Sequence, residues 1–135
     1  MAIDPGSKRI GLALSDETRT IASPYRTLTA EPAASLVDRL VAILREAGAE
    51  RILVGLPKNM DGSSGPEAKA ARVLAEHLRV ASGLPVEMID ERLSSVAAER
   101  HLVRGGMRRE KRRLVVDQVA ATLLLQSWLD GHRAR

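Results

Sequence analysis

Residues 52–56, Ile-Leu-Val-Gly-Leu, form an uninterrupted apolar run. A strand with one face in water alternates apolar and polar residues, whereas a strand covered on both faces is apolar throughout. Strands of the second kind occur mainly in parallel sheets that carry helices on both faces. The run therefore predicts a buried parallel strand in an α/β fold.

Helical patterns flank this strand on both sides. A helix is expected to begin at Pro32, as its first helical residue, and to end at Gly48. A second helix is expected from Pro66 to Gly83. Residues at helical spacing give each helix one apolar face: Leu36, Leu40, Ile43, Leu44 and Ala47 in the first, and Ala71, Leu74, Leu78 and Ala81 in the second.

Three strands are predicted before the first helix, over residues 1–4, 10–15 and 19–29. Pro24 places the third of them at a sheet edge, because proline cannot donate to a strand ladder. A last strand is expected over 85–89, and helices over 95–104 and 114–129. This order predicts one α/β domain over residues 1–135. Its mixed five-stranded sheet has a three-stranded antiparallel meander plus two parallel strands, flanked by helices.

Three acidic residues are predicted to converge at one end of this sheet. Asp4 ends the first strand and Glu91 follows the last one, and ligands of α/β sheets bind at the carboxyl ends of strands. Asp117 lies on the final helix, in line with the apolar positions Ala120 and Ala121. A carboxylate on a buried face calls for a cation as its partner.

Carboxylates alone indicate the kind of cation. The chain has no cysteine and its three histidines show no metal-ligand spacing, so the set suits Mg²⁺ or Mn²⁺. Two such ions can activate water for phosphodiester cleavage. Each acid also has a simpler interpretation. Asp4 accepts hydrogen bonds in the following turn, Glu91 pairs with Arg92 or another surface arginine, and Asp117 caps its helix or favours the helix N-terminus electrostatically.

The basic residues of the chain are concentrated in one segment. Residues 104–113 hold six basic residues and one acid, whereas the net charge of the whole chain is +4. Such a patch favours an anionic partner. From charge and position, the candidate phosphate contacts are Lys8, Lys58, Arg92, Arg104, Arg108, Arg109, Lys111, Arg112 and Arg113. An alternative function follows, a non-catalytic nucleic-acid-binding module that uses segment 104–113.

The composition excludes several other classes of protein. Without cysteine there is no disulfide framework, iron–sulfur cluster or thiol nucleophile. With one Trp, one Tyr and no Phe, an aromatic platform for stacking RNA bases is excluded. No window reaches the roughly 18 apolar residues of a membrane span, and no signal peptide is visible, so we expect a cytoplasmic protein.

Four motifs of the chain, taken together, resemble the YqgF/RuvX family. They are residues 3–13 (IDPGSKRIGLA), residues 55–62 (GLPKNMDG), residues 90–95 (DERLSS), and residues 117–121 (DQVAA) with 124–126 (LLQ). The resemblance spans nearly the whole chain with the motifs in the family's order. In the related junction-resolvase group a carboxylate ends the fourth strand, where this chain has Gly55-Leu56-Pro57.

The resemblance implies an RNase H-like fold and a metal-dependent endonuclease. It implies that Asp4, Glu91 and Asp117 are the catalytic acids and bind the metal, with Mg²⁺ or Mn²⁺ as cofactor, as a pair of ions. Family members are described as processing enzymes for the 5′ end of pre-16S ribosomal RNA, and also as Holliday junction resolvases. A four-way junction has two-fold symmetry, so the second role favours a homodimer.

Overall fold

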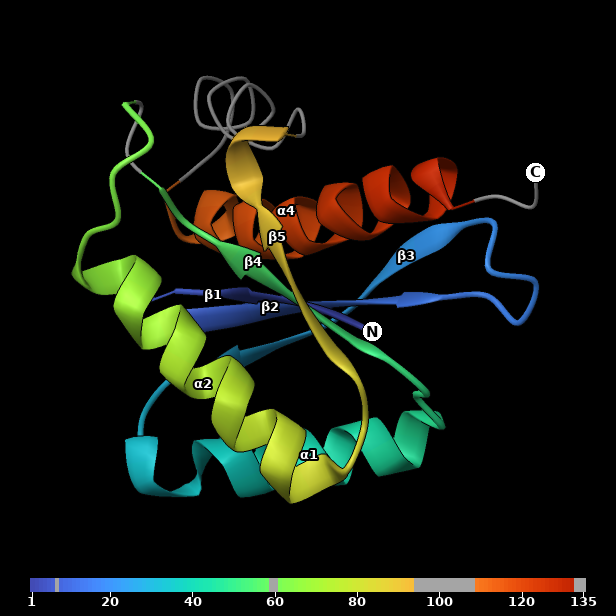
Figure 1. Ribbon diagram of the computed structural model, residues 1–135, viewed down its shortest axis with the longest axis horizontal. Helices are drawn as coiled ribbons and strands as arrows, with labels where there is room; N and C mark the ends of the chain where they lie inside the picture. Colours follow the sequence, from blue (N-terminus) through green and yellow to red (C-terminus); the bar gives the residue numbers. More distant parts are fainter. Residues whose placement is uncertain (7, 59–60, 94–108, 133–135) are drawn as a thin grey trace.

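The computed structural model describes residues 1–6, 8–58, 61–93 and 109–132 (Figure 1). For residue 93 and for residues 109–117 it describes the backbone alone. The elements are β1 (Ala2–Pro5), β2 (Arg9–Ser15), β3 (Ala22–Thr29), α1 (Ala33–Ala47), β4 (Ile52–Leu56), α2 (Pro66–Ser82), β5 (Val86–Asp90), a 3₁₀ turn (Glu91–Leu93) and α4 (Arg109–Gly131). The helix expected over 95–104 lies outside the described residues.

The strands form one mixed sheet in the order β3-β2-β1-β4-β5. β1 pairs with β2, and β2 with β3, in antiparallel fashion, while β4 is parallel to both β1 and β5. The predicted meander with two added parallel strands is therefore confirmed. β3 lies at an edge, as Pro24 indicated, and its register against β2 shifts between Leu12 and Ala13.

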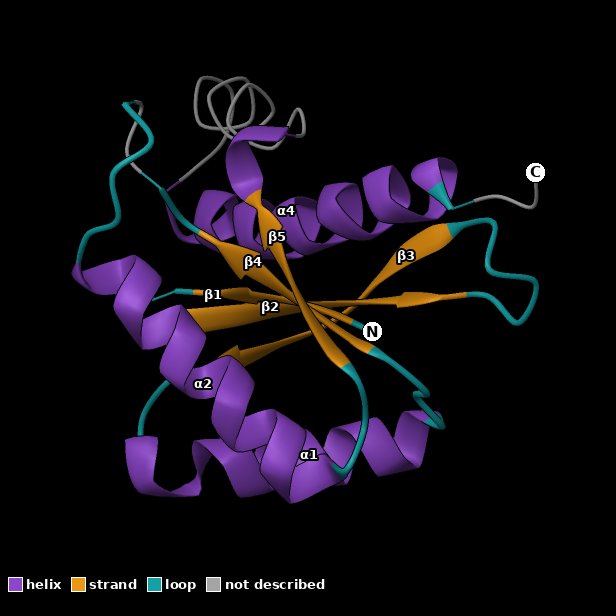
Figure 2. Cartoon of the chain, in the orientation of Figure 1, coloured by secondary structure: helices purple, strands orange, loops and turns teal. Residues whose placement is uncertain are grey.

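Helices cover the two faces of the sheet separately: α1 and α2 lie on one face and α4 on the other (Figure 2). Alternate residues of each strand supply the two cores. Ile3 packs in the cluster that contains Leu40 of α1, whereas its neighbour Ala2 packs with Ala121 and Leu125 of α4. β4 is buried along its whole length, as its apolar run predicted.

The ends of α1 and α2 follow from local sequence signals. Gly48 and Gly83 end them in the left-handed conformation, with φ of 68° and 72°. Pro66 is the first residue of α2, as predicted. Pro32 is not helical: its ψ of 133° is extended, so it occupies the N-cap of α1 and the helix begins one residue later.

Two helix predictions are corrected by the structure. Ala81 is exposed, because the buried face of α2 runs through Ala71, Ala75 and Leu78 and continues at Ser82. The last helix was predicted to begin at residue 114, after a basic loop, whereas α4 already begins at Arg109. Arg, Lys and Glu are good helix formers, so this charge run is compatible with a helix.

Candidate functional site

Asp4 is the buried acidic residue of the sheet, with 2% of its surface exposed. It lies near the end of β1 opposite Gly11 of β2. The chain then turns sharply at Gly6, where a Cβ atom would lie 2.4 Å from the carbonyl oxygen of Arg9. Only glycine fits this turn, which ends β1 directly beyond the acid.

Glu91 reaches the same place from the other side of β4. It lies one residue beyond β5, whose Ile89 is paired with Gly55 of β4. A Cβ atom on Gly55 would lie 3.1 Å from Glu91 Oε1 and 3.4 Å from Asp4 Oδ1. The two carboxylate oxygens can therefore be no farther apart than the sum of these two distances. The predicted convergence of Asp4 and Glu91, across one intervening strand, is what the structure shows.

The space between the two carboxylates exists because residue 55 has no side chain. The same hypothetical Cβ atom would lie 2.8 Å from Leu124 Cδ1 of α4, closer than two carbon atoms approach. Leu124 is buried, and it covers the space from the side of α4. A glycine at this point of β4 thus leaves a small cradle that is bordered by two acids and closed by one leucine.

This cradle has the donor chemistry of a site for a hard divalent cation. Its two carboxylates lie within the span of about 8 Å that two adjacent cations and their ligand bonds cover. Within the described side chains, no group of three acids, histidines or cysteines is close enough to hold a metal. The third predicted acid, Asp117, has its side chain outside that set.

The backbone of Asp117 belongs to α4, one helical turn before the buried residues Ala120 and Ala121. Since α4 begins at Arg109, Asp117 lies about two turns inside the helix. The simpler interpretation of Asp117 as a helix cap is therefore wrong.

A charged cluster lies next to Glu91, at the end of β5. Arg92 donates to Asp90, with 2.8 Å between Nη2 and Oδ2, and Lys58 lies 4.0 Å from the same oxygen. The Arg92 guanidinium holds the pKa of Asp90 below its usual value, first through its hydrogen bond. Among the described residues Arg92 thus pairs with Asp90, and not with Glu91, while the alternative that Glu91 pairs with another arginine stays untested.

The same arginine also contacts the segment after β4. A Cβ atom on Gly62 would lie 3.3 Å from Arg92 Nη1, and Gly62 has a φ of 88° that favours glycine. Asp61 raises the pKa of Arg92 through its charge, after the larger effect of Asp90. Two of the predicted phosphate contacts, Lys58 and Arg92, are therefore held side by side at the carboxyl end of the sheet.

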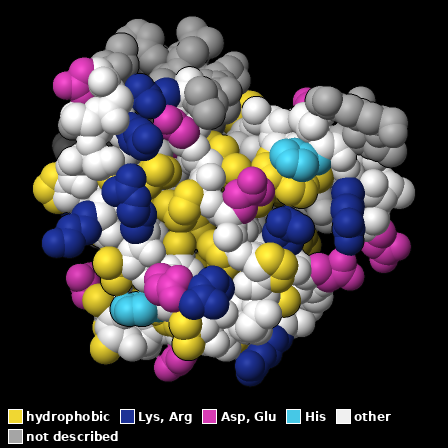
Figure 3. Space-filling view, in the orientation of Figure 1, with side chains coloured by type: hydrophobic (Ala, Val, Ile, Leu, Met, Phe, Trp, Pro, Cys, Tyr) yellow, Lys and Arg dark blue, Asp and Glu magenta, His cyan; other side chains and the backbone are white. Residues whose placement is uncertain are grey.

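The remaining predicted phosphate contacts have different positions. Lys8 is exposed in the turn between β1 and β2. Arg109, Lys111, Arg112 and Arg113 belong to the first turns of α4, and their side chains are outside the described set. Arg104 and Arg108 lie outside the described residues altogether. Figure 3 shows further Lys and Arg side chains along the side of the molecule where α2 lies.

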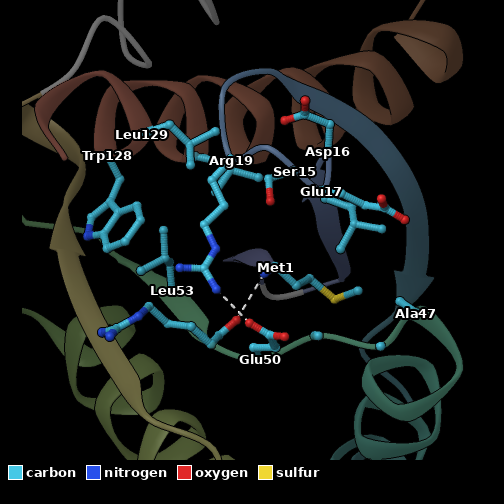
Figure 4. Close-up of a pocket in the computed structure, with 15 residues that line it drawn as sticks. Met1, Ser15, Asp16, Glu17, Arg19, Ala47, Glu50, Leu53, Trp128 and Leu129 are labelled. Carbon is cyan, nitrogen blue, oxygen red and sulfur yellow. Dashed lines mark hydrogen bonds and ion pairs between the residues drawn. The ribbon is translucent and has the colours of Figure 1, made fainter. Parts of the chain in front are cut away.

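A cavity of about 730 Å³ lies away from the two acids, at the amino end of β1 (Figure 4). Arg19 and Glu50 line this cavity and form an ion pair, with 2.6 Å between Nη2 and Oε2. Trp128 and Leu129 line it on the side of α4. The α-amino group of Met1 donates to the carbonyl of Arg51, and burial lowers the pKa of this amino group to about 6. This cavity is thus separate from the carboxylate cradle.

Sequence reasoning missed two contributors to the site. Gly55 opens the motif of residues 55–62, but the motif does not assign it a role, because the role of a missing side chain depends on what surrounds it. Leu124 reads as an ordinary core residue for the same reason. In the part of the chain that the structure describes, no helix is long and apolar enough to cross a membrane.

Comparison with known proteins gives concordant results. The family model described as "RuvX: Holliday junction resolvase" matches residues 1–131. A protein of Moorella thermoacetica named "Putative pre-16S rRNA nuclease" is 46% identical over 130 residues, covering 96% of this chain and 93% of that protein. A protein of the same name from Acidiphilium cryptum is 48% identical over 134 residues, covering 96% and 82%.

Solved structures agree on the fold. RuvC of T. thermophilus, in complex with a Holliday junction substrate, matches with a TM-score of 0.60 and 17% sequence identity, over 98% of this chain and 95% of the RuvC chain. RuvC has an RNase H-like fold, so the predicted RNase H-like fold is confirmed. The family model spans residues 1–131, and the two relatives are 46% and 48% identical to this chain in sequence. This chain therefore belongs to the RuvX family.

Proposed function

We propose that this chain is a metal-dependent endonuclease that cleaves phosphodiester bonds of structured nucleic acid. The observation that carries the proposal is the meeting of Asp4 and Glu91 over Gly55. The two carboxylates border one small space, the Asp4 side chain is 2% exposed, and carboxylate oxygens are the ligands that Mg²⁺ and Mn²⁺ prefer. Membership of a family described as Holliday junction resolvases supports the same function.

In this proposal Asp4, Glu91 and Asp117 hold Mg²⁺ or Mn²⁺ as a pair of ions. When bound, such ions supply charge stabilisation for the phosphate group and activation of water. The protein supplies the arrangement of the ligands. The rigid sheet holds Asp4, the end of β5 holds Glu91, Gly55 keeps the space between them open, and Leu124 limits access of water from α4.

The proposed substrate is the 5′ end of pre-16S ribosomal RNA, processed in the cytoplasm during ribosome biogenesis. The relatives at 46% and 48% identity are both named "Putative pre-16S rRNA nuclease". Lys58 and Arg92 would bind phosphates of the RNA beside the acids. The basic residues at the start of α4 would bind further phosphates along the RNA strand. Cation contacts of this kind position a strand without reading its sequence.

A second candidate is cleavage of four-way DNA junctions by a homodimer. It is favoured by the family description and by the fold shared with RuvC. The symmetry of such a junction would require two copies of the site. The third candidate is the non-catalytic binding module, which needs the basic residues but neither the acids nor a metal.

Cleavage of two labelled substrates distinguishes these candidates. A 5′-extended structured RNA and a four-way DNA junction are each incubated with Mn²⁺, Mg²⁺ or EDTA, using the wild-type chain and Asp4→Asn. We expect cleavage of the RNA that requires the metal and is lost in Asp4→Asn. If the chain cleaves the DNA junction faster than the RNA, the second candidate, a junction resolvase, is supported. If the chain binds either substrate without cleaving it, and if neither EDTA nor Asp4→Asn changes this binding, the third candidate, the non-catalytic binding module, is supported.

A further inference from the structure

One row of paired residues crosses the sheet at the level of Asp4. Thr27 of β3 is paired with Gly11 of β2, and Gly11 with Asp4 of β1. On the other side of Asp4, the parallel register of β1 and β4 pairs Ile3 with Val54, so Gly55 of β4 comes next to Asp4. Asp4 thus has a glycine on each side, and the next side chain toward the β3 edge is that of Thr27.

Thr27 is also the point where α4 is attached to this row. Gln118 Nε2 donates to Thr27 Oγ1 at 3.0 Å, in a partly buried hydrogen bond that joins residues 91 positions apart. Gln118 directly follows Asp117 in α4. One residue corresponds to about 1.5 Å along the helix and 100° around it, so fixing residue 118 fixes the backbone of residue 117 closely.

A second glutamine attaches the same helix to the same strand farther away. Gln126 Oε1 accepts from the backbone N–H of Ala22 at 2.8 Å, and its Nε2 donates to the carbonyl of Thr20 at 2.9 Å. Gln126 is eight residues, or about two turns, beyond Gln118. α4 is thus held to β3 by one contact beside Asp117 and by another remote from it.

We propose that Gln118 is a positioning residue for the carboxylate site, acting through Thr27. The hydrogen bond sets the rotation of α4 at residue 117 relative to the row that holds Asp4. A slip of the helix by one residue would turn position 117 by about 100° around the helix axis, out of the orientation that the proposed site requires. This inference rests on the proposed function, because it assigns the purpose of the bond to the placement of Asp117.

The packing around residue 118 explains why a polar contact is used for this purpose. Just beyond Gln118, the buried surface of α4 toward the sheet contains Ala120 and Ala121, which are small and equal in size. Small apolar side chains allow close approach but specify rotation weakly, whereas a hydrogen bond is directional. Gln118 and Thr27 therefore add specificity that the alanines do not provide.

The test measures Mn²⁺ binding and thermal unfolding of the full chain in parallel. The variants are Gln118→Met and Thr27→Val, which remove the bond, and Thr27→Ser, which retains a hydroxyl. Gln126→Met is the matched control, and Asp4→Asn tests the metal site itself. Loss of a group that orients a metal ligand weakens metal binding about 10- to 100-fold. We expect that loss in Gln118→Met and Thr27→Val, and near wild-type affinity in Thr27→Ser and Gln126→Met.

The outcomes separate the inference from the function on which it rests. If Gln118→Met and Thr27→Val unfold at lower temperature but bind Mn²⁺ like the wild type, the bond is structural and the inference is wrong. The same conclusion follows if Gln126→Met weakens Mn²⁺ binding as much as Gln118→Met does. If the wild type binds no Mn²⁺, or if Asp4→Asn binds it equally well, the proposed function fails and the inference fails with it.

Discussion

Asp4 belongs to β1 and Glu91 directly follows β5, two strands that share no hydrogen bonds, yet their carboxylates both border the space over Gly55 of the strand between them. Two acids that are 87 positions apart in sequence are brought together by the order of three parallel strands. Because Asp4 is inside the protein, its position is set by the sheet and not by a surface loop.

Asp4→Asn and Glu91→Gln are expected to abolish metal-dependent cleavage while leaving the fold intact. Each change keeps the size of the side chain and removes the charge that binds a cation. We expect cleavage rates to fall by at least about 100-fold, because loss of a group that merely orients a ligand already costs 10- to 100-fold. Single-turnover cleavage measures the effect, and circular dichroism verifies the fold. Cleavage at the wild-type rate in both variants would refute the site.

Gly55→Ala is expected to impair both stability and metal binding, for different reasons. The new methyl group would overlap Leu124 Cδ1, and overpacking of this kind costs about 1–3 kcal/mol. It would also project between the two carboxylates. Adding Leu124→Ala removes the overlap with the leucine but leaves the methyl group in the cradle.

The double variant therefore separates the two effects of Gly55→Ala. The free energy of unfolding of Gly55→Ala/Leu124→Ala, measured by denaturant titration, should be higher than the sum of the two single effects predicts. Metal affinity, measured by calorimetry, should stay as low as in Gly55→Ala. Recovery of metal affinity in the double variant would show that only the packing, and not the cradle, matters.

Lys58→Ala and Arg92→Ala are each expected to weaken nucleic-acid binding without changing sequence preference. A lost phosphate contact reduces the slope of log affinity against log salt by about 1. Arg79→Ala is the control, because Arg79 also forms an ion pair, with Glu76 on the exposed side of α2. Binding titrations at several salt concentrations measure the slope. An equal change in Arg79→Ala would indicate a general effect of net charge.

Asp16 makes the stability of the β2–β3 hairpin depend on pH in the acid range. Its Oδ1 accepts from the backbone N–H groups of Thr20 and Ile21, at 2.8 and 3.0 Å, and Thr18 Oγ1 donates to its other oxygen. The hydrogen bond from Ile21, followed by the others, lowers the pKa of Asp16 to about 2.

Because the folded pKa lies below the ordinary value of 3.8, this carboxylate stabilises the fold fully above about pH 4. The contribution is lost as the pH falls toward 2. The difference in free energy of unfolding between the wild type and Asp16→Asn should therefore be constant from pH 7 to about pH 4 and shrink below it. Urea titrations over this range measure it, and a difference independent of pH would contradict the assignment.

Elements that are marked by a repeating pattern of apolar residues, and residues that stand at the ends of such elements, could be predicted from the sequence. The alternation or continuity of apolar residues identifies the strands, and Asp4 and Glu91 follow from their place at strand ends. The shared site of these two acids was predicted because carboxyl ends of strands in such sheets meet at one edge. The edge position of β3 followed from Pro24 alone.

What the sequence does not reveal depends on long-range neighbours. The bond between Gln118 and Thr27 joins two polar residues with no common pattern, and the cradle at Gly55 depends on a side chain of α4. The early start of α4 was missed for a local reason. A run of charges after two glycines suggests a solvated loop, although Arg109 and the residues after it have good helix propensity.

The register shift in β3 has a consequence for the behaviour of this protein at high concentration. β3 is an outer strand, and an open strand edge can recruit a strand from another molecule and so begin aggregation. Pro24 has no N–H group to offer, and the irregular pairing beside it divides the strand into two short pieces. The exposed edge is therefore a poor template, and replacing Pro24 by a β-branched residue would lengthen it into a better one.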